Sequence, residues 1–118
     1  MNSGTNIGNY ATMTTDNTDR LADLVSRYMV LTKDVMPQMA RDPAINWPVR
    51  NDHCFQRIVL DNVCGRPWFD HLARPAYKHL SKDQAVRAVQ LCKAIIAGHA
   101  DLNDLNNKSL IWRGKQPR

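Results

Sequence analysis

Apolar residues recur every three or four positions along most of this chain, which is the spacing of one face of an α-helix. The first such pattern predicts a helix over residues 18–36. Its apolar positions are Leu21, Leu24, Val25, Tyr28, Leu31 and Val35. Pro37 should stop this helix or start a kink in it, because proline lacks a backbone N–H and its ring collides with the preceding turn.

A second helix is predicted over residues 52–64. Asn51 or Asp52 can cap its start, and Gly65 stands where a helix commonly ends in a left-handed residue. Apolar residues surround much of its girth, which is typical of a helix buried at the centre of a domain. Those residues are Phe55, Ile58, Val59, Leu60, Val63 and Cys64.

Two further helices follow two short turns. Prolines at 67 and 75 begin helical turns over residues 68–72 and 75–80. Residues 82–97 form the next predicted helix, preceded by a capping box, and residues 102–112 form the last one. Short Val and Ile runs all fall inside helical periods, so no strand is predicted. The fold class is therefore all-α, a small irregular bundle of four to five helices.

The chain length of 118 residues favours a single domain. Residues 1–17 are polar and without period, so we expect a disordered leader there, then one helical domain over 18–113 and a basic tail at 114–118. The three cysteines are an odd number, and neither a signal peptide nor a membrane-spanning run is visible. We therefore expect reduced thiols and a cytoplasmic location.

Positive charge gathers in the second half of the chain. The net charge is +5, and the residues from Gly65 onward hold ten Lys and Arg against four Asp. This asymmetry predicts a small non-enzymatic binding or regulatory protein that contacts nucleic acid or an acidic protein partner. An ordinary solvated basic surface is the alternative. The predicted binding residues are Arg66, Trp68, Arg74, Tyr77, Lys78, Lys82 and Arg87.

The central helix carries polar residues among its apolar ones. Arg57 and Asp61 are four apart and should meet across one helical turn. With Asn62 and His53 they predict either a structural network that fixes helix packing or a ligand site that uses the guanidinium. The chain contains no Glu, which excludes a Glu-based acid–base mechanism.

Metal and catalytic readings of the same region are weaker. The gaps between Cys54, Cys64, His71 and His79 are ten, seven and eight residues, unlike the close ligand pairs of structural zinc sites. The glycines are scattered, so no phosphate-binding loop is present. The sequence therefore predicts no catalytic residue, no metal site and no cofactor.

Two stretches, HCFQRIVLDN…W…PAY.HL and ADLNDLN..SL.WRG, carry a resemblance over about residues 47–115. They resemble short bacterial proteins catalogued as acetyltransferase-like members of the GNAT superfamily. The resemblance implies a mixed α/β fold and acetyl-coenzyme A held by an Arg/Gln-x-x-Gly-x-Gly/Ala loop. The stretch from Arg57 to Gly65 lacks that spacing, so no cofactor-binding residue carries over.

Two alternatives to the binding protein remain open. One is a small acyltransferase-like or nucleotide-handling enzyme, or an enzyme subunit, built around Arg57, Asp61 and His53. The other is a homodimeric structural protein with Trp47 and Trp112 at its interface.

Overall fold

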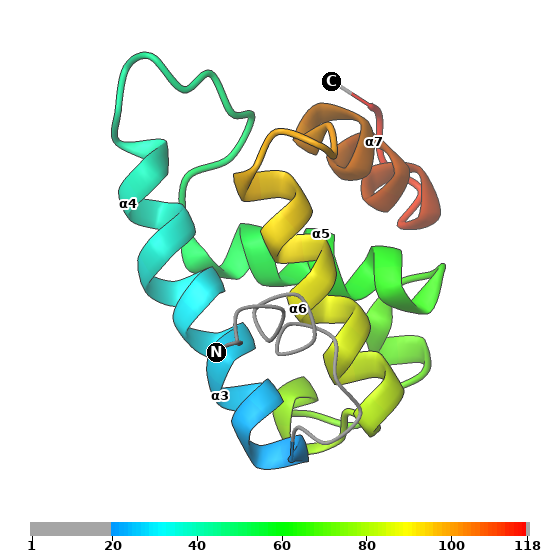
Figure 1. The fold of residues 1–118 in the computed structure, drawn as a ribbon. Coiled ribbons are helices and arrows are strands. Elements are labelled where there is room, and N and C mark those ends of the chain that lie inside the picture. Colours follow the sequence, from blue (N-terminus) through cyan, green and yellow to red (C-terminus); the bar gives the residue numbers. More distant parts are fainter. Residues whose placement is uncertain (1–19, 118) are drawn as a thin grey trace, which may run out of the picture.

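The structure, a computed structural model, describes residues 20–117, which form helices joined by loops and contain no strand. The all-α prediction is confirmed, and the mixed α/β architecture that the acetyltransferase resemblance implies is absent from these residues. The predicted leader at 1–17 lies outside them. In chain order (Figure 1) the elements are α3 (Leu21–Val30), η1 (Leu31–Val35), α4 (Met36–Ala40), α5 (Asp52–Cys64), η2 (Trp68–Asp70), η3 (Ala76–Lys78), α6 (Lys82–Ile96) and α7 (Leu102–Trp112).

The first helix continues through Pro37 to Ala40, so a stop at the proline was the wrong expectation. The reason is η1, a π-helical turn directly before the proline, in which the N–H of Met36 donates to the carbonyl of Leu31, five residues back. The wider turn shifts the hydrogen-bond register where a proline ring would otherwise collide with the carbonyl four residues earlier. Inside this turn the buried Thr32 hydroxyl donates to the Tyr28 carbonyl at 2.9 Å.

Helix α5 is the centre of the fold and begins and ends where the sequence predicted. The Asn51 side chain accepts from the N–H of Cys54, and Gly65 ends the helix in the left-handed region with φ 70°. Phe55, Ile58 and Val59 are completely buried. Helix α5 packs against α6, α7, η1 and η2, which confirms a central, largely enclosed helix.

The other helices close around α5. The predicted capping box of Ser81 and Gln84 is present at the start of α6, and the Asp101 side chain caps α7. Helix α6 packs along α3, and Ala85 and Ala88 are completely buried on it. No helix in the part of the chain that the structure describes is long and apolar enough to cross a membrane.

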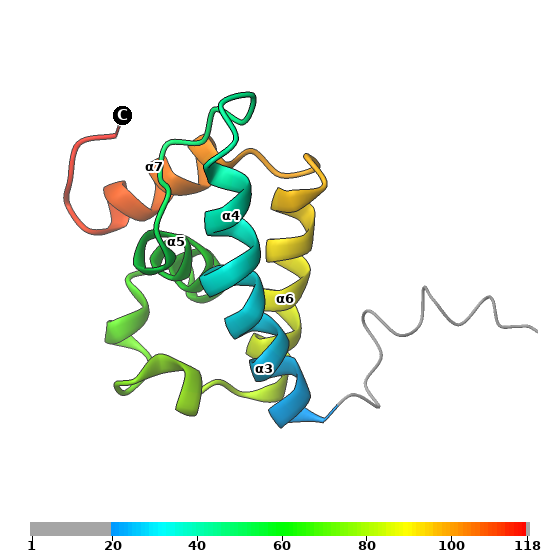
Figure 2. The same ribbon diagram turned by 90° about the vertical axis from the view of Figure 1, so that its left-hand side faces the viewer.

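The segment between α5 and α6 contains little regular structure, but it is attached to the core. It contains η2 and η3 and leaves the end of α5 to return to the start of α6 (Figure 2). Leu72, Ala76 and Leu80 are buried along it, so its apolar side chains attach it to the core. It thereby forms one side of the pocket described below.

Burial of Cys92 on α6 predicts a pH-dependent loss of stability. Desolvation raises the pKa of this thiol from 9.0 to about 12. Between these values the unfolded chain loses a proton that the folded chain keeps, so the free energy of unfolding falls as pH rises through this window. The decline is up to about 1.4 kcal/mol per pH unit.

Chemical denaturation from pH 8 to 11 measures this slope. The variants Cys92→Ala and Cys92→Val differ in packing volume but both remove the proton, so both should decline less steeply than the wild type. Burial also raises the pKa values of Tyr28 and Cys64, and we assign the slope that remains to these two groups. An unchanged slope in both variants would contradict the assignment to Cys92.

Candidate functional site

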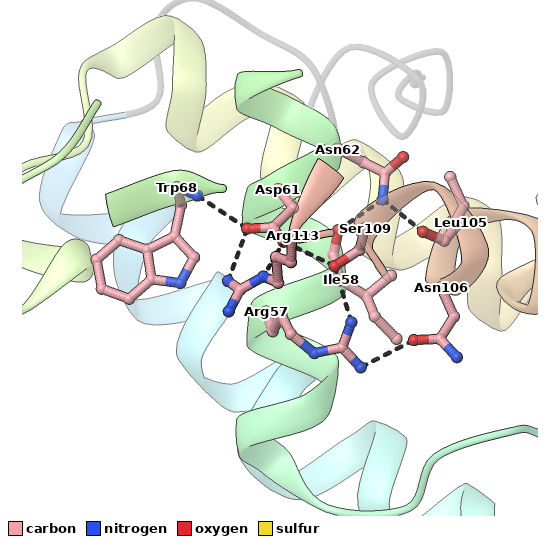
Figure 3. A network of polar contacts seen from close by, with 9 residues as sticks. All are labelled: Arg57, Ile58, Asp61, Asn62, Trp68, Leu105, Asn106, Ser109 and Arg113. Carbon is pink, nitrogen blue, oxygen red and sulfur yellow. Dashed lines mark hydrogen bonds and ion pairs between the residues drawn. The ribbon is translucent and has the colours of Figure 1, made fainter. Parts of the chain in front are cut away.

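Asp61 lies completely buried on α5, and its carboxylate accepts four hydrogen bonds (Figure 3). Arg113, just beyond α7, donates two of them, from Nε at 2.7 Å and from Nη2 at 3.1 Å. The Ser109 hydroxyl donates at 2.7 Å and the backbone N–H of Trp68 at 2.9 Å. One carboxylate therefore joins α5 to α7 and to the segment that carries η2.

Arg57 does not pair with Asp61, which corrects the expected contact across one helical turn. Its Nη1 donates to the Ser109 hydroxyl and its Nη2 to the Asn106 side-chain oxygen, both at 2.8 Å. Both acceptors are neutral. Among the described residues no carboxylate forms an ion pair with Arg57, whereas the charge of Asp61 is balanced by Arg113.

Of the two remaining residues of the predicted network, one joins the contacts between α5 and α7 and the other does not. Asn62 donates to the carbonyls of Ile58 at 2.8 Å and Leu105 at 3.0 Å, so it also links α5 to α7. His53 stands apart from these contacts, with 89% of its side chain exposed. The structure thus places Arg57, Asp61 and Asn62 in the contacts between α5 and α7 and leaves His53 outside them, although His53 and Arg57 line the same pocket.

Sequence reasoning missed the partners that α7 and its end supply. Asn106, Ser109 and Arg113 are spaced three and four apart, which places them on one face of a helix. Polar residues in that register, on a helix that also buries Leu102 and Leu110, are the pattern that could have revealed them.

A pocket of about 830 Å³ opens beside this network. We call it the arginine pocket. Its sides are α3 with η1, α5 as far as Leu60, the segment from η2 to η3, and Arg113 just beyond α7. Lys33, Arg57, Arg74 and Arg113 are its basic lining residues, and Asp52 is the acidic one. Its aromatic lining residues are Tyr28, Trp68, Phe69 and Tyr77.

Two arginines stack on aromatic rings at this pocket. The Arg74 guanidinium carbon lies 5.3 Å from the ring centre of Trp68 and 5.6 Å from that of Phe69. The Arg113 guanidinium carbon lies 5.0 Å from the ring centre of Phe69. Such contacts hold a guanidinium in place without using its N–H edges. The Nε–Nη2 edge of Arg113 is used by Asp61, so this applies to Arg74 in particular.

Three of the seven predicted binding residues, Trp68, Arg74 and Tyr77, line the arginine pocket. The other four, Arg66, Lys78, Lys82 and Arg87, do not. Arg87 forms an exposed ion pair with Asp83 at 3.8 Å on α6. The predicted set therefore divides into residues that line the arginine pocket and residues that lie outside it. The roles of all seven in binding stay predictions.

The thiols and imidazoles do not form a cluster. Within residues 20–117 no three side chains of the His, Cys and Asp kinds gather where they could hold a metal ion. Cys54 lines the arginine pocket, whereas desolvation raises the pKa of Cys64 and keeps that thiol protonated near neutral pH.

No family model, curated protein or solved structure matches this chain. Its function is therefore inferred from the residues and geometry of the arginine pocket.

The contacts of Asp61 predict a large stability loss for Asp61→Asn. The amide keeps the size of the side chain but leaves the Arg113 guanidinium without a balancing charge and turns one acceptor into a donor. Breaking a buried pair in this way costs about 3–5 kcal/mol. Urea denaturation gives the free energy of unfolding.

The matched control is Asp83→Asn, which breaks the exposed pair with Arg87 on α6. Pairs of this kind contribute about 0.3–0.5 kcal/mol. Equal losses in the two variants would show that the buried network does not hold the fold together.

Proposed function

We propose that this protein is a non-enzymatic binding protein that takes single-stranded nucleic acid in the arginine pocket. The observation that carries the proposal is the environment of Arg57. Arg57 is half-buried and lines the pocket, and its guanidinium has only neutral hydrogen-bond partners among the described residues. A positive charge held in this way favours an anion that arrives from outside.

The charges around Arg57 support the same class of partner. Lys33 and Arg74 also line the pocket, and Asp52 is its acidic lining residue. A groove with this excess of positive charge can follow a phosphate backbone. Three of the predicted residues outside the pocket, Arg66, Lys78 and Lys82, would steer the strand toward it, whereas the charge of Arg87 is offset by Asp83.

The aromatic rings favour nucleic acid over an acidic protein partner. Phe69 is 43% exposed and Tyr77 is 38% exposed, and both line the pocket beside Trp68. Exposed rings next to basic groups serve as stacking platforms for unpaired bases, each worth about 1–3 kcal/mol. An acidic peptide would use the same charges without needing these rings.

A second candidate is a small anionic ligand, as expected of a nucleotide-handling protein. A volume of about 830 Å³ falls in the range of small-molecule pockets. Thermal shift against nucleotides and coenzyme A tests this candidate, because a ligand of the native state raises its melting temperature. Acyl transfer, which the GNAT resemblance implies, stays a prediction.

The homodimer also stays a prediction. Trp47 is half-buried and packs edge-on against Phe55 with ring centres 5.6 Å apart, whereas Trp112 is among the exposed large apolar residues. Light scattering reports the oligomeric state.

Fluorescence anisotropy with a labelled 20-nucleotide single strand tests the proposed function. We expect binding that weakens with salt, and weaker binding to the matching duplex. Arg74→Gln and Lys33→Gln should each lower the affinity about tenfold, because each removes a charged contact to phosphate. Each should also reduce the salt slope by about 1.

Arg87→Gln is the matched control, because it removes the same charge from an exposed position on α6 outside the pocket. We expect it to lower affinity less than twofold. If it weakens binding as much as Arg74→Gln, the arginine pocket is not the site. If the wild type binds no strand at low salt, the proposed function is wrong.

A further inference from the structure

The Arg57 guanidinium is fixed in direction before any partner arrives. Its two neutral acceptors, Asn106 and Ser109, are buried on α7. The Ser109 hydroxyl accepts from Arg57 and donates its hydrogen to Asp61, so its orientation is set by both neighbours. Figure 3 shows this chain of contacts running from α7 to Arg57. Such preorganisation lowers the entropy cost of binding an anion.

The charge at the pocket exceeds what one phosphodiester supplies. Four basic side chains line it, and two carboxylates offset them, Asp52 in the lining and Asp61 behind Arg113. Two positive charges remain. A phosphodiester inside a strand carries one negative charge, whereas a phosphate monoester carries about −1.5 to −2 near neutral pH. For a single phosphate group inside the pocket, the monoester is the closer match.

The depth of Arg57 favours the same group. Arg57 is half-buried between α5 and α7, while Phe69 and Tyr77 are exposed at the rim of the pocket. A phosphate inside a strand is connected to nucleotides on both sides, so it fits at the rim of a pocket better than inside it. A phosphate at a strand end has chain on one side only and can reach inward while its base stacks on a rim ring.

We infer that Arg57 binds the terminal phosphate monoester of a single strand, so that the arginine pocket recognises a phosphorylated end. This inference rests on the proposed function and adds the group that is recognised. Ser109 and Asn106 use two of the five N–H groups of the Arg57 guanidinium, and the other three can donate to phosphate oxygens. Lys33 supplies further charge.

The experiment compares one eight-nucleotide single strand in three forms, with a 5′ phosphate, with a 3′ phosphate and with hydroxyls at both ends. We expect one phosphorylated form to compete about tenfold better than the hydroxyl form, from charge-assisted hydrogen bonds to the added group. Arg57→Gln should abolish this preference, and Arg57→Lys should retain part of it. Arg74→Gln, the control at the rim, should bind every form more weakly but keep the preference.

The outcomes separate the inference from the proposed function. Equal affinity for all three forms overturns end recognition and leaves strand binding standing. No binding of any form overturns the proposed function.

A spectroscopic titration tests Arg57 without a variant, in case Arg57→Gln fails to fold. Phenyl phosphate, a monoester with a ring, should shift the Nε–Hε resonance of Arg57 in the wild type. Methyl phenyl phosphate, the corresponding diester, should shift it less. No shift with phenyl phosphate overturns the inference even if strands bind.

Discussion

The burial of one charged group, the carboxylate of Asp61, sets the arrangement of most of this molecule. Taking a carboxylate out of water costs several kcal/mol unless a counter-charge and hydrogen bonds replace the water. The partners that satisfy Asp61 come from the end of α7 and from the start of η2, so these segments must converge on α5. The arginine pocket opens beside this convergence because two of its lining residues, Trp68 and Arg113, are placed by the same carboxylate.

The helices could be predicted because the features that define them are local. The cap of α5 at Asn51, its left-handed end at Gly65 and the capping box of α6 all depend on residues within four positions of one another. The course of the first helix through Pro37 could not be predicted in this way. It depends on the choice of a π-helical turn over an α-helical one. Gln56 on α5 donates to the Thr32 hydroxyl inside that turn at 3.2 Å, and this contact exists only once α5 packs against η1.

The hydrogen-bond partners in the site could not be predicted from the sequence. Helical spacing tells which side chains can reach each other, but it does not tell which of them pair. Arg57 is within reach of Asp61 along α5, but Arg113, 52 residues away, presents two N–H groups to the carboxylate. Two donors in a fixed fork bind a carboxylate better than one flexible contact along a helix. The aromatic and basic residues of the η2–η3 segment were recognisable because they crowd a short stretch. Which of them face a pocket depends on tertiary packing.

The contacts of Arg57 and Asp61 allow the structural prediction and the ligand-site prediction to hold together, because the two residues have different partners. Asp61 is fully satisfied within the fold and has no lone pair to spare for a ligand after four hydrogen bonds. By taking Arg113, it leaves Arg57 to neutral acceptors, and neutral acceptors fix a guanidinium without cancelling its charge. In an ion pair between Arg57 and Asp61 the two charges would cancel, and α5 would present no net positive charge to the pocket. Because Asp61 pairs with Arg113 and Arg57 bonds to neutral groups on α7, the same set of residues forms both a buried network and a positively charged pocket.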